Sequence, residues 1–186
     1  MKRAILLTII LLACLPIISS GQGKLLGKQV YDTAAACEKD HPAGFYSSAA
    51  SFYAKGDKYG AGFLFYLGQL RYRYYCAANA NLPPDGDRAI MASLNSTVGE
   101  EINFYLGGHV EEYLQVVDAV LAWNKTHEFE FFPKTKDPKD AKEILDGLVE
   151  LRTYVAGHKK EITAQHKETE EMLKKYEQSQ QQDSTK

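Results

Sequence analysis

From residue 59 to about residue 79, apolar side chains recur at the spacing of an α-helix: Phe63, Tyr66, Leu67, Leu70 and Tyr74 fall on one face. A stripe of this kind is typical of a helix that packs one side against a core. Helical periodicity recurs along the rest of the chain. An alternating, strand-like pattern is confined to a few residues near 130, where a proline ends it. The sequence therefore predicts an all-α fold.

Glycines, prolines and capping residues divide the chain into further helices. Asp137 followed by Pro138 is a typical helix start, because aspartate accepts free backbone amides and proline fits the first turn. Thr97 and Glu100 have the spacing of a capping box, which predicts another start at residue 97. We expect a compact array of six to seven helices over residues 28–38, 43–55, 59–79, 87–94, 97–106, about 110–121 and, as one long C-terminal helix, from 138 onward.

The chain has the size of one globular domain with additional segments at each end. Of its 186 residues, 45% are hydrophobic, which is enough for one core without a metal or many disulfides. We expect the helical domain over residues 22–156. Over 157–177 the apolar stripe becomes sparse, which indicates a helical extension that packs loosely. Residues 178–186 are polar and of low complexity, and we expect a disordered tail there.

The first residues have the pattern of an export signal. A short basic start precedes an apolar run over residues 4–18, and small residues follow. This pattern predicts a signal peptide over residues 1–21, since the run is too short to span a membrane. We therefore expect a periplasmic or secreted protein. The segment ending at Cys14 also resembles a bacterial lipobox, so the alternative is lipidation of Cys14 and a lipid anchor in the cell envelope.

The number of cysteines fits an oxidising compartment. Once Cys14 is removed or lipidated, Cys37 and Cys76 remain. In an exported protein, an even pair favours a disulfide. This bridge would close a loop of about 40 residues and stabilise the fold by roughly 4 kcal/mol in the chain-entropy model. The alternative is that both residues are buried free thiols.

One helix pair has the residue spacing of a known repeat. Phe52, Gly56, Ala61, Phe65 and Gly68 follow one another at intervals of four, five, four and three residues. Over residues 45–68 this resembles the second half of helix A, the turn and helix B of a tetratricopeptide repeat. The resemblance implies an antiparallel hairpin whose small residues let the helices approach, and a scaffold that binds proteins. The sequence shows no second copy at the repeat's period of about 34 residues.

Charge and motif content argue against nucleic-acid binding and catalysis. The 22 Lys and Arg residues nearly balance the 24 Asp and Glu residues, and loss of Lys2 and Arg3 changes the net charge from −2 to −4. Nucleic-acid-binding domains are usually strongly basic. The sequence shows no motif for an activated nucleophile. His158 and His166 lie about 12 Å apart along a helix, too far to share a metal. We expect no enzymatic activity, no metal and no cofactor.

Two aromatic segments are candidates for a binding surface. Residues 69–76 combine Tyr with Arg, two side-chain types enriched at protein-interface hot spots. Leu70 and Tyr74 face inward on this helix, which leaves its other faces for binding. The aromatic loop before residue 133 is the second segment. For both, the alternative is that the rings pack in the core. The binding candidates are Arg71, Tyr72, Arg73, Phe129 and Phe131.

These features favour a binding protein. We expect an exported helical interaction module of the bacterial cell envelope whose partner is another protein. Size, export, acidity and helical content make it comparable, by class analogy, with periplasmic immunity proteins that neutralise toxins. The alternative is a small-molecule binding protein or an enzyme with a pocket between helices near Tyr66 and Tyr74.

Overall fold

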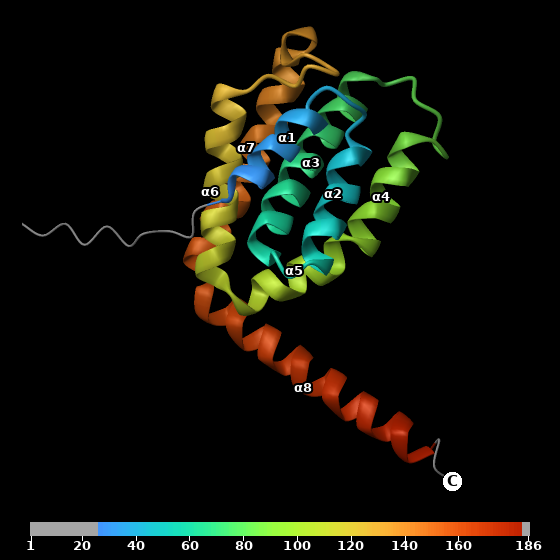
Figure 1. The fold of residues 1–186 in the computed structure, drawn as a ribbon, viewed down its shortest axis with the longest axis vertical. Helices are drawn as coiled ribbons and strands as arrows, with labels where there is room; N and C mark the ends of the chain where they lie inside the picture. Colours follow the sequence, from blue (N-terminus) through green and yellow to red (C-terminus); the bar gives the residue numbers. More distant parts are fainter. Residues whose placement is uncertain (1–25, 184–186) are drawn as a thin grey trace, which may run out of the picture.

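The computed structural model describes residues 26–183, so the predicted signal peptide and the lipidation candidate Cys14 lie outside the described residues. Within this range all regular structure is helical, which confirms the all-α prediction. Eight α-helices form where six to seven were expected, because the long C-terminal helix is interrupted at His158 (Figure 1). They are α1 (Lys28–Cys37), α2 (Ala43–Ala54), α3 (Lys58–Ala78), α4 (Asp87–Thr97), α5 (Gly99–Gly108), α6 (Val110–Thr126), α7 (Pro138–Gly157) and α8 (Lys159–Asp183), with a 3-10 turn, η1 (Lys134–Lys136), before α7.

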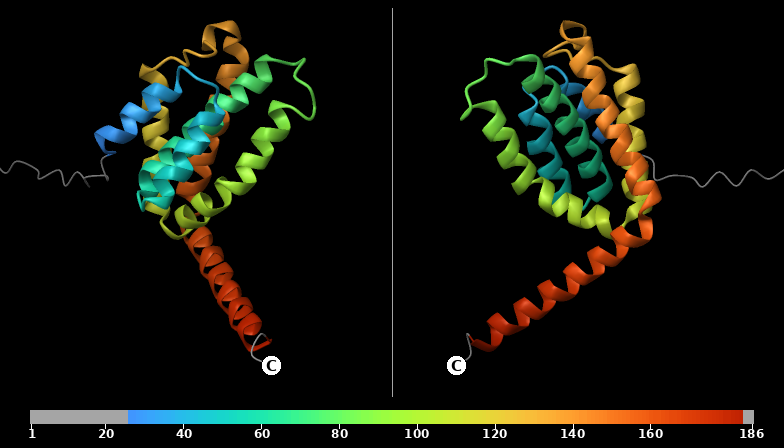
Figure 2. Two further views of the ribbon diagram at one scale, coloured as in Figure 1. Left: turned by 45° about the vertical axis from the view of Figure 1, so that its right-hand side comes forward. Right: turned by 180° about the vertical axis from the view of Figure 1, so that it is seen from behind.

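The central element of the fold is α3. It contacts α1, α2, α4, α5, α6 and α7, and 15 of its 21 residues are buried (Figures 1 and 2). Members of the predicted stripe, such as Leu67 and Tyr74, face inward as expected. Burial also extends around the other faces of α3, because neighbouring helices cover it on almost every side. The core is therefore arranged around this one helix.

The expected antiparallel hairpin is formed by α2 and α3. Gly56 follows α2 with φ at +88°, a conformation that glycine adopts without strain. Asp57 then caps α3, since its side chain accepts a 2.9 Å hydrogen bond from the backbone amide of Gly60. The helices touch where Gly68 meets Phe45, and a Cβ at Gly68 would overlap the Phe45 Cβ. The close approach of the two helices depends on the absence of that side chain.

The junction of α4 and α5 differs from the predicted capping box. Val98 both ends α4 and precedes α5. The Thr97 hydroxyl donates to the Ser93 carbonyl at 2.9 Å, as threonines inside helices do, so the predicted helix start at residue 97 is wrong. The start of α7 matches its prediction, because Asp137 accepts a 3.1 Å hydrogen bond from the Asp140 amide.

The last helix, α8, projects from the body as an arm (Figures 1 and 2). Its first half is seated on α5, where the ring of His166 lies 4.4 Å from the ring of Phe104. The sequence predicts a disordered tail from residue 178, whereas the structure continues the helix to Asp183. Residues 178–183 include four glutamines, which are good helix formers, and this explains the difference. Each helix within residues 26–183 is either too short or too polar to span a lipid bilayer.

Both cysteines of the described chain are buried free thiols. The Cys37 sulfur lies 3.6 Å from the hydroxyl oxygen of Ser48. The Cys76 carbonyl accepts a 3.1 Å hydrogen bond from Arg88 of α4. Burial raises the pKa of both thiols above the ordinary value, which reduces the thiolate fraction at neutral pH. The disulfide is not formed in this structure and stays a prediction, which thiol titration of the unfolded, unreduced protein tests.

Candidate functional site

The five binding candidates do not share one surface. Arg71, Tyr72 and Phe129 are buried, so the expectation that Arg71 and Tyr72 are free to bind is wrong. The faces of α3 outside the predicted stripe are covered by side chains from other elements: Glu38 after α1, Asn124 on α6 and Asp87 on α4. Arg73 is exposed, and Phe131 is 39% exposed. Of the predicted surface, only these last two reach solvent.

Arg71 is the centre of a buried polar cluster. Its guanidinium donates to both carboxylate oxygens of Glu38, at 2.8 Å from Nε and 2.6 Å from Nη2, and also to the side-chain oxygen of Asn124. Trp123 Nε1 donates to the same carboxylate at 2.9 Å. The guanidinium carbon lies 5.6 Å from the centre of the Phe129 ring. Buried charges are tolerated when every polar atom has a partner. The cluster therefore fastens α1, α3 and α6 together.

A second polar cluster joins the loop before α2 to α4. His41 Nε2 and the Tyr72 hydroxyl both donate to Oδ1 of Asp87, each at 2.9 Å. His41 Nδ1 accepts a 3.3 Å hydrogen bond from the Ala43 amide. A catalytic base needs a nitrogen that faces a nucleophile or a substrate, and here both ring nitrogens are engaged. The arrangement holds α4 in place.

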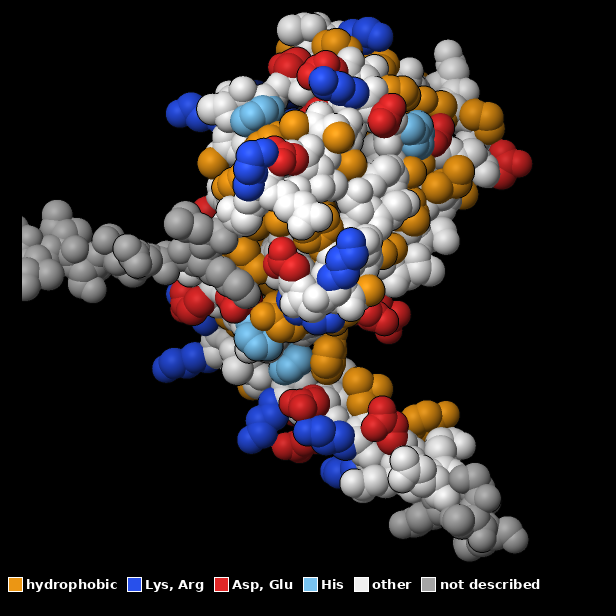
Figure 3. All heavy atoms as spheres, in the orientation of Figure 1, with side chains coloured by type: hydrophobic (Ala, Val, Ile, Leu, Met, Phe, Trp, Pro, Cys, Tyr) orange, Lys and Arg blue, Asp and Glu red, His pale blue; other side chains and the backbone are white. Residues whose placement is uncertain are grey.

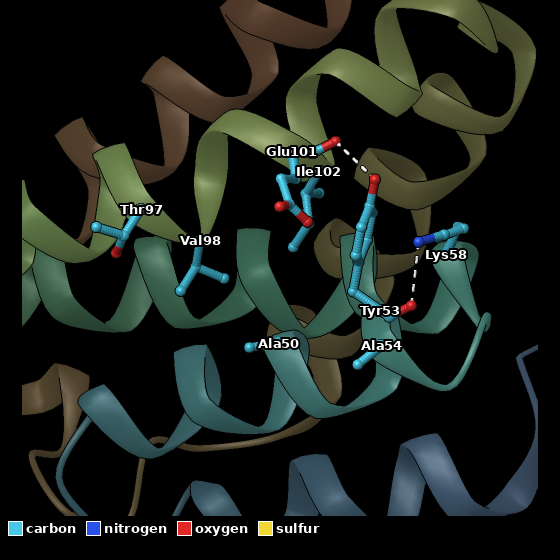
Figure 4. Close-up of a pocket in the computed structure, with 8 residues that line it drawn as sticks. All are labelled: Ala50, Tyr53, Ala54, Lys58, Thr97, Val98, Glu101 and Ile102. Carbon is cyan, nitrogen blue, oxygen red and sulfur yellow. Dashed lines mark hydrogen bonds between the residues drawn. The ribbon is translucent and has the colours of Figure 1, made fainter. Parts of the chain in front are cut away.

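A groove of about 400 Å³ opens between α2, α3 and the α4–α5 junction (Figure 4). Tyr53 lines one end of it, and the Tyr53 hydroxyl donates to the Glu101 carbonyl at 3.2 Å. Lys58 Nζ lies 3.0 Å from the centre of the Tyr53 ring and donates to the Tyr53 carbonyl at 3.1 Å. The volume is in the range of small-molecule sites. The lining residues are Ala50, Tyr53, Ala54, Lys58, Thr97, Val98, Glu101 and Ile102.

The predicted pocket near Tyr66 and Tyr74 lacks space for a ligand on the Tyr74 side. The cavity lined by Tyr74 and Arg71 measures about 10 Å³, which is enough for one water molecule at most. The Tyr66 hydroxyl donates to Asn103 at 2.7 Å and lies 2.6 Å from the hydroxyl of Tyr113. The Tyr74 hydroxyl is engaged by backbone groups at both ends of η1. These tyrosines are interior packing residues with satisfied hydroxyls.

The outer half of α8 carries an apolar stripe that no other helix within residues 26–183 covers. Met172, Leu173 and Tyr176 are 63%, 48% and 63% exposed. The stripe continues one that is covered nearer the body, where Ile162 packs against a small apolar cluster on α6 and α7. Charged residues occupy the other side of the arm, and Glu170 pairs with Lys174 at 2.7 Å. Figure 3 shows hydrophobic side chains along one edge of the projecting helix.

Neither a metal site within residues 26–183 nor a similarity to known proteins indicates where the functional site lies. Among residues 26–183, no group of three or more His, Cys, Asp or Glu side chains has the arrangement of a metal site. Comparison of the chain with models of protein families, with curated proteins and with solved structures gives no significant match. The resemblance of residues 45–68 to a tetratricopeptide repeat stays a prediction. The outer stripe of α8 and the groove at Tyr53 are the candidate sites.

Proposed function

We propose that the protein is an interaction module that binds another protein through the outer half of α8. The observation that carries the proposal is the uncovered stripe of Met172, Leu173 and Tyr176 on a helix that stands clear of the body. An amphipathic helix with an open apolar side is a common recognition element, since it fits a hydrophobic groove or pairs with another helix. Arg73 and Phe131 lie on the body and are not needed for this mode of binding.

The size of the stripe limits what it can do alone. Complete burial of a large apolar side chain stabilises by roughly 1.5–3 kcal/mol, and these three side chains are about half buried already. Their further burial supplies roughly 2–5 kcal/mol, whereas association costs at least about 4 kcal/mol. A stable complex therefore needs contacts beyond the stripe. We expect the partner to extend along the charged flanks of α8, where Glu170 and Lys174 lie.

The proposed setting is the bacterial cell envelope. The export pattern of the first 21 residues supports this setting. A soluble exported form and a lipid anchor at Cys14 are both compatible with an arm that works outside the cytoplasm. Neutralisation of a toxin, as periplasmic immunity proteins do, is one form that the interaction can take.

Crosslinking from defined positions tests the proposal. A photoreactive amino acid replaces Tyr176 on the arm or, as the matched control, Val149, an exposed apolar residue on the body in α7. In the native host, position 176 should give a discrete crosslinked partner and position 149 should not. The variant Leu173→Asp should abolish the product from position 176. Equal crosslinking from both positions, or a product that survives Leu173→Asp, would contradict a role for the stripe.

The groove at Tyr53 favours a second candidate function, the binding of a small molecule. Its volume and its apolar floor of alanines are the supporting observations. Ala54→Phe would fill the groove without touching the buried core. Ligands found by thermal-shift screening of the wild-type protein should therefore lose their effect in this variant. Ligands that still shift the melting temperature of Ala54→Phe bind elsewhere.

A further inference from the structure

The helix α4 is attached to the body differently from its neighbours. None of its 11 residues is buried, and Ile90 is 47% exposed. The next helix, α5, buries Ile102 and Leu106 in the core. The apolar side chains that α4 does turn inward, Met91 and Leu94, are only partly buried. Figures 1 and 2 show α4 on the outside of the helical body.

Polar contacts to buried and half-buried side chains hold α4 against the body. At its first turn, Asp87 accepts from His41 and from Tyr72, each at 2.9 Å. At its last turn, Asn95 accepts from the Tyr46 hydroxyl at 2.9 Å and from the Gln69 amide at 3.1 Å. Together with the 3.1 Å hydrogen bond from Arg88 to the Cys76 carbonyl, these four bonds join both ends of α4 to the α2–α3 hairpin and its preceding loop.

The two ends of α4 differ in how firmly the chain is fixed. After Val98, a Cβ at Gly99 would lie 2.6 Å from Cζ of Phe65, so the chain is pinned against the core at that point. Before α4, residues 79–86 form a connection without a helix. A rotation about Val98 would therefore move α4 while α5 stays in place.

We infer that α4 is a hinged cover that opens about Val98 as a unit and exposes Tyr46, Tyr72 and the thiol of Cys76. Opening replaces the hydrogen bonds of Asp87, Arg88 and Asn95 with bonds to water, so the net loss for each bond is small. On the α4 side, only partly buried side chains such as Met91 and Leu94 separate from the core. Segments with few buried apolar contacts open at free energies below that of global unfolding. The cover is independent of the proposed role of α8.

Labelling of cysteines in the reduced protein tests this inference. A maleimide is added, and the rate at each cysteine is read by peptide mass mapping. Asn95→Ala leaves the Tyr46 hydroxyl without its acceptor in the closed state, so Cys76 should be labelled about tenfold faster. The rate at Cys37, which lies against Ser48 of α2, should not change. Asp118→Ala, which removes an ion pair with Arg152 between α6 and α7, is the matched control and should leave both rates unchanged.

Hydrogen exchange of the wild-type protein gives a second measurement that needs no variant. Amides of residues 87–97 should exchange together and faster than those of α3 and α5. Equal protection of α4 and α3 would overturn the inference. So would a rise in the Cys37 rate that matches the rise at Cys76 in Asn95→Ala, because global unfolding exposes both thiols.

Discussion

At the scale of single residues, the described chain depends on polar groups that are buried with their partners. Arg71 and Glu38 are both almost inaccessible, and Trp123 and Asn124 complete their hydrogen bonding. Such a pair adds little stability compared with apolar residues of the same volume. Removal of one partner is costly, because the other charge is then left in the interior without compensation.

Arg71→Met should therefore lower the free energy of unfolding by about 3–5 kcal/mol. Urea denaturation followed by circular dichroism measures the change. The matched control is Arg152→Met, which removes an arginine from an exposed ion pair with Asp118 and should leave the urea midpoint unchanged. If both variants shift the urea midpoint equally, burial of the ion pair does not determine how much stability its loss removes.

Tyrosine burial predicts a loss of stability at high pH. Burial raises the pKa of nine tyrosines above 10, and for Tyr105, whose hydroxyl donates to Glu112, burial together with that carboxylate raises it to about 12. The unfolded chain loses these protons near pH 10 and so binds fewer protons than the folded chain above that pH. Stability is thus present below pH 10 and is lost as the pH rises toward 12. Absorbance at 295 nm should titrate later in the native protein than in urea, and superimposable curves would contradict the prediction.

At the scale of helices, the hairpin of α2 and α3 is the element on which the rest is assembled. Gly68 allows the two backbones to approach at Phe45, and small residues at such crossings set the distance between helices. The turn at Gly56 and the cap at Asp57 fix where each helix ends.

Gly68→Ala should destabilise the protein even though alanine is the better helix former. The new methyl group overlaps Phe45, and overpacking of a core typically costs about 1–3 kcal/mol. Gly147→Ala on α7 is the control, because no atom lies within 4 Å of the added Cβ there; it should stabilise by up to about 1 kcal/mol. Thermal denaturation compares the two, and a higher melting temperature for Gly68→Ala would show that the helices do not meet at this glycine.

The sequence predicted where the helices lie better than it predicted which residues pack against each helix. Periodicity predicted α3 and its inward face because both depend on residues a turn apart. The burial of Arg71 depends on Glu38, 33 residues earlier, and on Asn124, 53 residues later, so no local pattern signals it. The same holds for His41, whose partner Asp87 is 46 residues away.

Local signals also fail where two short patterns compete. The Thr97 hydroxyl can cap the following helix or bond to the preceding turn, and packing of Gly99 against Phe65 decides in favour of a break at Val98. The open stripe on α8 continues a predicted pattern. Only the structure separates the part that Ile162 buries from the part that stays exposed.

At the scale of the whole molecule, the helical body and the outer part of α8 contribute differently to stability. The core includes residues from α1, α2, α3, α5, α6 and α7, and the side chains described over residues 171–181 of α8 are all exposed. Exposed positions without special contacts usually change stability by less than about 0.5 kcal/mol.

Deletion of residues 171–186 should therefore change the melting temperature by no more than about 2 °C. Ile162→Asp should lower it by several degrees, since this side chain packs with Val110, Leu114 and Val155 where the arm meets the body. Differential scanning calorimetry of the two variants separates the seat of the arm from its tip. A large drop on deletion would mean that the tip folds back onto the body in solution.

The direction of α8 also sets a distance. Tyr176 lies ten residues beyond His166, the side chain that still contacts α5, and at 1.5 Å per residue this is about 15 Å of helix. A molecule held at Tyr176 would be kept away from the core by this rigid spacer, and its bulk would not have to match the contours of the body. Partners of very different size and outline could be accommodated at the tip, provided that each offers a short apolar segment to the helix.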